Sequence, residues 1–216
     1  MTELTNLRFA KYEGLGNDFL VVDASSETFL DASQAVTLCN RHFGVGADGV
    51  LLVTKPTSLG ARATMVVLNA DGSRPEMCGN GLRCVALHLA LQDRAQGVSF
   101  IVDTDAGPRL VAVEGSYAST SVSVGMGRGV PEGELDYAFG GASLKFALVS
   151  MGNPHAISFD AEFDVQRLDQ LGPALSAQFP AGTNVELVVK REERQLEVLV
   201  WERGVGRTLA CGTGAC

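Results

Sequence analysis

The chain has 216 residues, of which 46% are hydrophobic and 19% charged, and its formal net charge is −8 at pH 7. This composition is typical of a globular protein and excludes extensive disorder, and the negative charge argues against nucleic-acid binding, which needs clustered Lys and Arg. Because no apolar run approaches the roughly 18 residues of a membrane helix and the first residues lack a secretory-signal pattern, we expect a cytoplasmic protein with no membrane partner.

Short strands and two helices are predicted in the first half of the chain. A helix is expected over residues 31–42, where Asp31 stands at the start. A second helix, over residues 79–96, is apolar on nearly all sides, so we expect strands to bury it. The strands are rich in Val, Leu, Ile or Thr and are bounded by Gly, Asp or Pro. They are predicted at residues 7–12, 19–23, 49–54, 63–69, 99–104, 109–114 and 119–125.

The second half repeats this pattern with fewer elements. Residues 163–178 have helical character, but Gly172 and Pro173 interrupt them, so two short helical pieces are expected. Strands are predicted at residues 142–150, 155–159, 184–190 and 195–201.

Two cysteine motifs indicate that the two halves are related. Met-Cys-Gly-Asn-Gly-Leu-Arg-Cys at residues 77–84 and Ala-Cys-Gly-Thr-Gly-Ala-Cys at residues 210–216 place Cys78 and Cys211 at an offset of 133 residues. A Gly-Asn pair precedes each cysteine, ending at Asn17 and at Asn153, at a similar distance. The chain is therefore interpreted as a duplicated domain.

The duplication predicts an α+β fold with two pseudo-symmetric domains, each a curved, mostly antiparallel sheet around a central helix. We expect the first domain at residues 1–117, with Cys78, and the second at residues 118–216, with Cys211. A helix opened by Cys211 would begin at Gly212, four residues before the end of the sequence. The second domain is therefore expected to lack its C-terminal helix and strands, and we interpret the sequence as a fragment.

Each cysteine stands directly before a Gly-x-Gly run that could open a helix. Unpaired N–H groups and the helix dipole at such a position lower the pKa of a thiol and bind anions. A thiolate on one side and a thiol on the other suit the removal of the α-proton of an amino acid and its return to the opposite face. Donors at the helix starts would stabilise the charge that develops on the carboxylate. Two acid/base thiols are thus expected at Cys78 and Cys211.

The five cysteines form an odd-numbered set in a chain expected to be cytoplasmic, so structural disulfides are not expected. Their spacings, C-x5-C and C-x4-C, differ from those of structural zinc sites, so no metal is expected. Cys39 and Cys84 are interpreted as packing residues, and His42 and His88 as structural ones. His155 stays open between a structural role and a hydrogen bond in the wall of the site.

Eight stretches, taken together, resemble the diaminopimelate epimerase family and follow that family's order. The resemblance implies cofactor-independent epimerisation, without pyridoxal phosphate, of LL-2,6-diaminoheptanedioate to the meso form, in lysine and peptidoglycan-precursor synthesis. It implies a small-molecule substrate and no cofactor, and it is compatible with a homodimer. The stretches are residues 14–19, 41–49, 69–73, 76–84, 151–155, 182–185, 202–206 and 210–216.

The resemblance also implies roles for single residues. Cys78 and Cys211 would be the two acid/base residues, and residues 44–49 would form a loop near the site. Asparagines beside Gly, Pro or Asp are also common turn formers, and a Glu-Arg pair at a strand end can be an exposed ion pair of little consequence. The reacting carboxylate would be bound by Gly79, Asn80, Gly212 and Thr213, and the distal end of the substrate by Asn17, Asn69, Asn153, Asn184, Glu202 and Arg203.

Two other functions remain open at this point. A proline or hydroxyproline racemase of the same superfamily also pairs two cysteines, but its substrate has no second charged end and would not need Glu202, Arg203 and several asparagines. A non-catalytic protein that binds an amino acid or zinc is the alternative from a different class.

Overall fold

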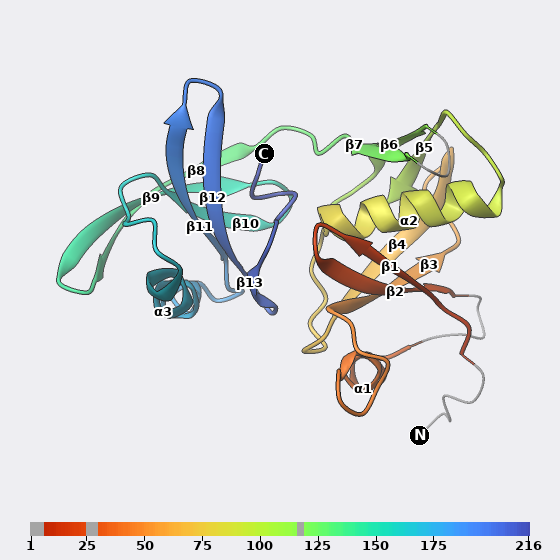
Figure 1. Cartoon of the computed structure of the whole chain (residues 1–216), viewed down its shortest axis with the longest axis horizontal. Helices are drawn as coiled ribbons and strands as arrows, with labels where there is room; N and C mark the ends of the chain where they lie inside the picture. Colours follow the sequence, from red (N-terminus) through yellow and green to blue (C-terminus); the bar gives the residue numbers. More distant parts are fainter. Residues whose placement is uncertain (1–6, 25–29, 116–118) are drawn as a thin grey trace. The chain divides into compact units, whose positions relative to one another are not determined.

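The computed structural model describes residues 7–24, 30–115 and 119–216, which form two compact units (Figure 1). Unit 1 comprises Met1–Gly14 and Asp18–Gly125, and unit 2 comprises Leu15–Asn17 and Met126–Cys216. The predicted domain boundary, between residues 117 and 118, lies outside the described residues. No helix in the described part of the chain is long and apolar enough to cross a membrane.

Unit 1 is built on one seven-stranded sheet, in the order β1-β2-β3-β4-β5-β6-β7. The pairs β2–β3 and β4–β5 are parallel, whereas β3–β4, β5–β6 and β6–β7 are antiparallel. The sheet is therefore mixed, and antiparallel pairs outnumber parallel ones among these five strand pairs. Its strands are β1 (Ala10–Gly14), β2 (Asn17–Asp23), β3 (Gly49–Thr54), β4 (Ala61–Asn69), β5 (Val98–Asp103), β6 (Arg109–Glu114) and β7 (Ser121–Val124).

Helix α2 (Gly79–Gln92) is the buried helix of unit 1. It packs against β1, β3, β4, β6 and β7, and Figure 1 draws it alongside these strands. Ten of its fourteen residues are buried, which confirms the prediction from its apolar composition. It ends four residues earlier than predicted because Arg94 has a φ of 51°. The Ala95 N–H then donates to the Ala90 carbonyl at 2.9 Å, a bond that closes helix ends.

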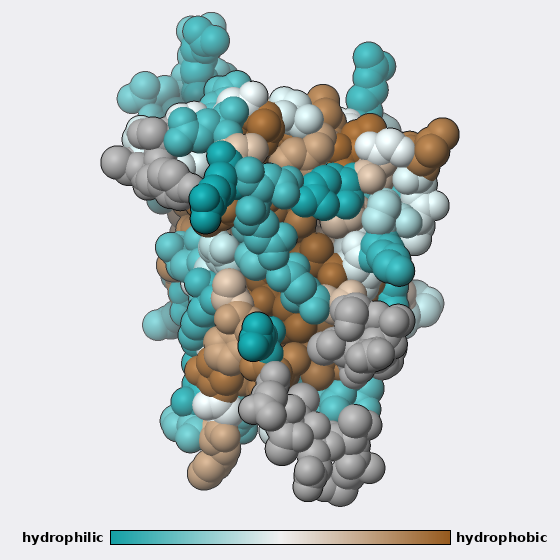
Figure 2. All heavy atoms as spheres, turned by 90° about the vertical axis from the view of Figure 1, so that its right-hand side faces the viewer, coloured by the Kyte–Doolittle hydropathy of each residue, from teal (hydrophilic) through white to brown (hydrophobic). Residues whose placement is uncertain are grey.

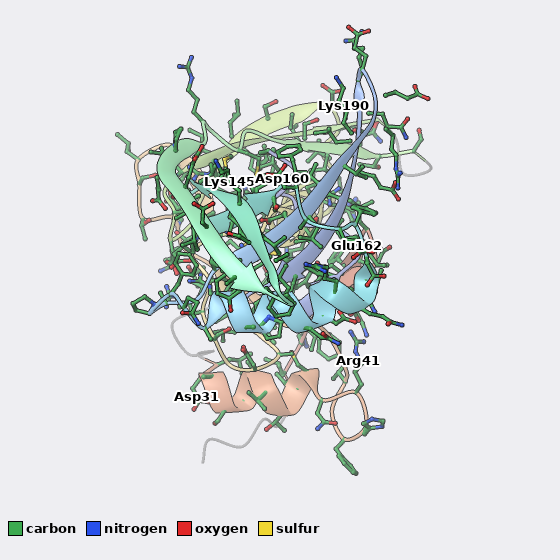
Figure 3. All side chains as sticks on the ribbon, turned by 90° about the vertical axis from the view of Figure 1, so that its left-hand side faces the viewer. Asp31, Arg41, Lys145, Asp160, Glu162 and Lys190 are labelled. Carbon is green, nitrogen blue, oxygen red and sulfur yellow. The ribbon has the colours of Figure 1, made fainter. Side chains whose placement is uncertain are left out.

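Helix α1 (Ala32–Cys39) begins with a capping box and ends in a loop that folds back on it. Asp31 accepts a hydrogen bond from the Gln34 N–H, and the Gln34 side chain accepts one from the Asp31 N–H. Figure 3 labels Asp31 at the start of this helix and Arg41 beyond its end. A Cβ on Gly44 would lie 2.2 Å from the Thr37 carbonyl oxygen. Glycine is therefore needed where the loop covers the last carbonyls of the helix.

Charged side chains hold this loop to the sheet. The Arg41 guanidinium contacts Asp18 at 2.6 Å and Asp48 at 2.7 Å, and the Lys11 ammonium contacts Asp18 at 2.9 Å. Burial acts to raise the pKa of Asp18, but hydrogen bonds from Arg41 and Lys11 outweigh it and lower that pKa to about 2. Residues 41–49 thus form a loop that these ion pairs fix to the sheet of unit 1.

Unit 2 contains a six-stranded sheet in the order β13-β12-β11-β10-β9-β8. Its pairs are antiparallel except β10–β11, which is parallel. The two sheets with their packed helices bear out the predicted α+β class. The strands are β8 (Val130–Phe139), β9 (Ala142–Ser150), β10 (Pro154–Ser158), β11 (Asn184–Glu192), β12 (Gln195–Glu202) and β13 (Gly206–Thr208).

The helical segment of unit 2 is one continuous helix, α3 (Val165–Ser176), so the predicted break was wrong. Pro173 removes one intrahelical N–H donor, but the apolar face of the helix offsets that loss. Leu168, Leu171 and Leu175 are fully buried there, and the helix packs against β11, β12 and β13. Burial of three leucine side chains contributes about 1.5–3 kcal/mol each, which is comparable to or larger than the cost of one proline.

Gly172 allows α3 to approach β12 closely, because a Cβ at this position would lie 2.4 Å from Cγ of Trp201. We expect Gly172→Ala to destabilise the protein by about 1–3 kcal/mol, the usual cost of overpacking a core. Urea unfolding followed by Trp201 fluorescence measures this loss. Gly125→Ala is the control, since its Cβ would meet no atom nearer than 3.5 Å. Equal stability of the two variants would contradict the close approach.

Two strands of unit 2 were not predicted. Strand β8 contains Pro131 and Gly133, which obscure its pattern, and the pairing with β9 shifts register between them. As the last strand in the sheet order, β8 tolerates a proline because one of its edges has no partner strand in the described sheet. Strand β13 has only three residues, too few to give a periodic signal.

The surface combines polar and apolar side chains. Figure 2 shows hydrophilic residues over much of the face that it draws, with hydrophobic ones gathered toward its middle. Among the described residues, Phe43 is 93% exposed and Leu59 is fully exposed. Single exposed apolar residues of this kind are normal on protein surfaces.

Two buried thiols make the stability of unit 1 sensitive to alkaline pH. Burial, with smaller contributions from nearby carboxylates, raises the pKa of Cys39 from 9.0 to about 11, and burial likewise raises that of Cys84 to about 11. Above pH 9 the unfolded chain loses these protons while the folded chain keeps them, so the free energy of unfolding falls as pH rises from 9 to 11. Below pH 9 both thiols are protonated in the folded and in the unfolded chain, so their full contribution to the free energy of unfolding is present.

Urea unfolding at several pH values checks this expectation. Cys39→Ala is expected to make the decline between pH 9 and pH 11 shallower, whatever its effect at neutral pH. Cys216→Ser, which changes an exposed cysteine, should leave the decline as it is. A slope that is the same in wild type and Cys39→Ala would contradict the expectation.

Candidate active site

Cys78 occupies the N-cap of α2. Its sulfur accepts a hydrogen bond from the Gly81 N–H at 3.3 Å, and its carbonyl accepts one from the Leu82 N–H at 2.8 Å. A thiol in this position replaces the serine or aspartate side chain that usually caps a helix. The sulfur therefore lies at the N-terminus of α2, toward which the N–H groups of the first turn point.

Cys211 has the same two hydrogen bonds in unit 2. The Gly214 N–H donates to its sulfur at 3.4 Å, and the Ala215 N–H donates to its carbonyl at 3.0 Å. Each of these atoms corresponds to one around Cys78 at the same offset of 133 residues. The duplication read from the sequence thus extends to the hydrogen bonds of the two cysteine turns.

A chain of hydrogen bonds leads from Cys211 into the interior of unit 2. The Cys211 sulfur lies 3.3 Å from Oγ1 of Thr213, which accepts from the Asn153 amide at 3.2 Å. Oδ1 of Asn153 lies 3.1 Å from Nε2 of His155, and Nδ1 of His155 lies 2.6 Å from Oε1 of Glu186. Because an amide oxygen can only accept, Nε2 carries a proton. All five residues are buried.

Two carboxyl groups lie beside this chain. Burial raises the pKa of Glu186 although His155 is hydrogen-bonded to it. Burial also raises the pKa of Glu202, although the Thr208 hydroxyl donates to Glu202 and the Cys211 side chain likewise acts to lower that pKa. Proton-binding groups are therefore concentrated around Cys211.

The Cys211 thiol differs from the expectation drawn from its helix start. Burial, followed by the charges of Glu202 and Glu186, raises its pKa well above the ordinary value, and the hydrogen bonds from Thr213 and Gly214 do not offset this. The predicted lowering is therefore wrong for Cys211. At neutral pH this residue is a protonated thiol.

Four of the predicted site residues lie in unit 1. Gly79 and Asn80 are buried in the first turn of α2 directly after Cys78, and Oδ1 of Asn80 accepts from Arg83 at 2.6 Å. Asn69, at the end of β4, donates through its side chain to Oγ of Ser73 at 3.0 Å. The turn-forming role considered for the asparagines is thus present at Asn69.

The other predicted residues belong to unit 2. Oδ1 of Asn184 accepts from the Arg203 N–H at 2.9 Å, and the Arg203 guanidinium donates to the Ala181 carbonyl at 2.9 Å. These bonds join the start of β11 to the end of β12. Asn17 is buried, with 7% of its surface exposed. Thr213 and Asn153 lie in the hydrogen-bond chain of Cys211, and the charge of Glu202 acts to raise the pKa of the Cys211 thiol.

Two residues of this cluster were not among the predicted site residues. The sequence is compatible with either a structural or a site-wall role for His155, and the structure places this residue between Asn153 and Glu186. The sequence signal of Glu186 is a charged residue within the apolar run 185–189, two positions after Asn184 and hence on the same face of β11.

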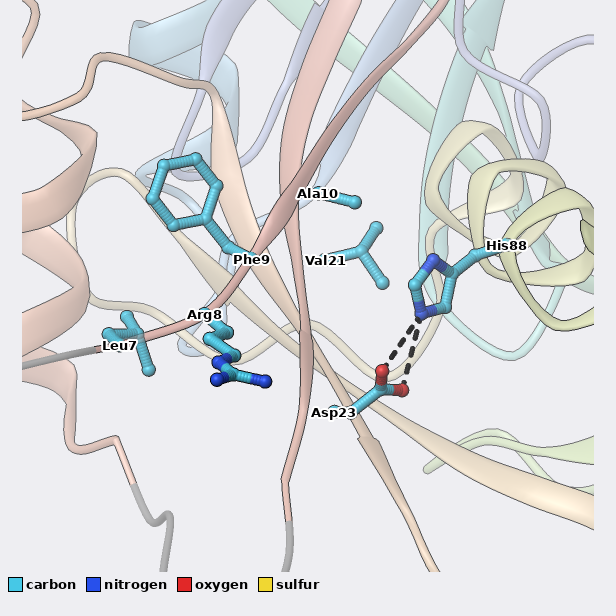
Figure 4. Close-up of a pocket in the computed structure, with 7 residues that line it drawn as sticks. All are labelled: Leu7, Arg8, Phe9, Ala10, Val21, Asp23 and His88. Carbon is cyan, nitrogen blue, oxygen red and sulfur yellow. Dashed lines mark hydrogen bonds and ion pairs between the residues drawn. The ribbon is translucent and has the colours of Figure 1, made fainter. Parts of the chain in front are cut away.

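A separate pocket in unit 1 contains none of the predicted site residues among the described residues that line it (Figure 4). Its volume is about 430 Å³, and it includes Asp23 and His88, which are 3.2 Å apart. The His88 ring also lies 3.1 Å from the Tyr12 hydroxyl. These contacts fit the structural role predicted for His88.

The sequence model of diaminopimelate epimerase matches residues 9–130 and 147–216. The chain belongs to the diaminopimelate epimerase family. It is 42% identical to the diaminopimelate epimerase of Synechocystis sp. and 43% identical to that of Synechococcus elongatus, over 97% and 98% of this chain and 81% of each relative. It is 40% identical to the chloroplastic enzyme of Oryza sativa subsp. japonica, of which it spans 66%.

Solved structures share the fold of this diaminopimelate epimerase family member. A probable proline racemase from Agrobacterium radiobacter has a TM-score of 0.76 at 15% identity, with coverage of 97% of this chain and 74% of that one. A hydroxyproline epimerase from Agrobacterium vitis has a TM-score of 0.73 at 15% identity, with coverage of 96% and 73%. At this identity the likeness concerns the fold alone.

Proposed function

We propose that this protein epimerises LL-2,6-diaminoheptanedioate to the meso form by proton transfer between thiols and the α-carbon. Membership of the diaminopimelate epimerase family supports the substrate. The observation that carries the mechanism is the matching pair of cysteine turns. In each turn the backbone N–H of the third residue after the cysteine, Gly81 or Gly214, donates a hydrogen bond to the cysteine sulfur. Each turn provides one group that can hold or release a proton.

We assign different starting states to the two thiols. Cys211 begins as the proton donor, because burial and the neighbouring carboxyl groups raise its pKa. Cys78 then acts as the base that removes the α-proton. When Cys211 gives its proton to the α-carbon, the resulting thiolate is stabilised by the Gly214 N–H, and the neighbouring Glu202 can return a proton to it.

The backbone and side-chain donors after each cysteine would stabilise the charge that forms on the substrate carboxylate. We propose this role for Gly79 and Asn80 in unit 1 and for Gly212 and Thr213 in unit 2. We propose that Asn17, Asn69, Asn184 and Arg203 recognise the distal amino and carboxylate groups. Glu202 and Asn153 are instead assigned to the surroundings of Cys211, on the basis of their contacts.

We also infer a cytoplasmic location. None of the five cysteines, all of which lie in the described part of the chain, forms a disulfide, and unoxidised thiols persist in reducing compartments. The proposed thiol chemistry itself requires that two of them stay reduced.

An assay in deuterium oxide tests the proposed function. The protein is incubated with LL-2,6-diaminoheptanedioate, and the meso product and the loss of the α-proton signal are followed by NMR. We expect epimerisation with incorporation of solvent deuterium at the α-carbon and without added cofactor. Turnover of proline under the same conditions, with none of the diamino acid, would instead favour the racemase alternative.

A further inference from the structure

Three buried side chains of unit 2 bring nitrogen, oxygen and sulfur donors together. One ring nitrogen of His155, one carboxylate oxygen of Glu186 and Sγ of Cys211 all lie within 4.8 Å of one another. Their exposed fractions are 2%, 0% and 8%. They come from β10, β11 and the turn after β13, so the sheet fixes two of the three donors.

A second observation concerns the carboxyl group of Glu186. Its Oε1 is hydrogen-bonded to Nδ1 of His155 at 2.6 Å. Its Oε2 is buried and has no hydrogen-bond partner among the residues that the structure describes. Buried polar atoms are nearly always satisfied, and an orphan of this kind often marks the place of an ion or a water molecule. The cluster therefore has an unused oxygen donor.

The charges around the cluster favour a cation. The negative charges of Glu202 and Glu186 repel a negative charge on the Cys211 sulfur. A divalent ion would offset two carboxylates and a thiolate at once, which a single imidazolium cannot do. A thiolate, an imidazole and a carboxylate form the donor set that Zn²⁺ prefers, whereas Mg²⁺ and Ca²⁺ prefer oxygen alone.

We propose that His155, Glu186 and Cys211 form a binding site for one Zn²⁺ ion. On binding, the S–H bond of Cys211 breaks and a zinc–sulfur bond forms. The proton that Nδ1 of His155 and Oε1 of Glu186 share also leaves, which frees Nδ1 for a zinc–nitrogen bond, and both protons are released to the solvent. The affinity therefore increases with pH. This site goes beyond the proposed function, since the metal takes no part in epimerisation. If Cys211 is an acid/base residue, zinc would act as a reversible inhibitor, and that consequence alone rests on the proposed function.

Titration of the full chain with Co²⁺ under reducing conditions tests the site without any substrate. We expect a thiolate-to-cobalt charge-transfer absorption that saturates at one ion per chain and is removed by an equimolar amount of Zn²⁺. Cys211→Ser should abolish this absorption. Glu186→Gln removes a ligand and should weaken cobalt binding by more than the roughly tenfold loss that follows when a residue supporting a ligand is replaced. The matched control is Cys216→Ser, which alters an exposed thiol only five residues further on and should keep the full signal.

The opposite pattern would overturn the proposal. An absorption that persists in Cys211→Ser but disappears in Cys216→Ser would assign cobalt binding to the exposed thiol. Unchanged affinity in a folded Glu186→Gln variant would exclude Glu186 as a ligand. If circular dichroism shows that Glu186→Gln is unfolded, His155→Gln is tested instead. An unchanged cobalt affinity in His155→Gln would likewise overturn the proposed three-residue site. A missing epimerase activity with intact cobalt binding would contradict only the proposed function.

Discussion

Replacement of Cys211 with serine is expected to lower the rate of epimerisation by about 10²- to 10⁴-fold, the range in which a positioned acid or base contributes to catalysis. Serine keeps the size and the capping hydrogen bond of cysteine, but its hydroxyl is a far weaker acid than a thiol. The variant therefore lacks the proton donor for the α-carbon. Rates of formation of the meso product from the LL substrate measure the effect.

A finer readout separates loss of one base from loss of the whole site. In Cys211→Ser the Cys78 thiolate can still remove an α-proton and return solvent deuterium to the same face. We therefore expect exchange without inversion for the substrate isomer that presents its proton to Cys78. Cys216→Ser should behave like the wild type. Full epimerisation by Cys211→Ser would end the assignment of Cys211 as an acid/base residue.

The second large effect is expected at Gly214, the residue whose N–H donates to the Cys211 sulfur. A Cβ at this position would lie 2.5 Å from Oε1 of Glu186 and 3.2 Å from its carboxyl carbon. Glu186 is fully buried and bonded to His155, so it cannot move away freely. We expect Gly214→Ala to lower kcat by about 10²-fold, since a displacement of about 1 Å in an active site has effects of this size.

Two glycine variants serve as comparisons for Gly214→Ala. Gly81→Ala alters the equivalent position beside Cys78, where the Cβ would lie 2.9 Å from a methyl group of Leu51 and 3.3 Å from the Cys78 sulfur. It should also reduce activity, but by displacing an apolar side chain rather than a carboxyl. Gly125→Ala has room for its Cβ and should keep wild-type kcat. Wild-type activity in Gly214→Ala would show that the Glu186 carboxyl tolerates displacement.

The elements predicted with good accuracy share one property: their signal is local. Strands β3, β6 and β9 were predicted with the bounds that the structure has, because each is a short run of β-formers between turn residues. The burial of α2 followed from a helix that is apolar on nearly all sides. The errors arose where packing overrode a local signal. Helix α3 continues through Pro173 because three leucines bury its face, and β8 includes a proline because it lies at an edge.

The amino-acid sequence by itself determined the family, the two cysteine motifs and their repetition at a fixed offset, because each cysteine and the glycines around it are contiguous in the chain. Only the tertiary structure decided the environment of Cys211. His155, Glu186 and Glu202 come from three different strands, and sheet pairing brings them around one sulfur. The pKa of that thiol depends on how deeply it is buried and on which carboxyl groups lie beside it. Both are consequences of long-range packing, which the helix-start motif alone does not contain.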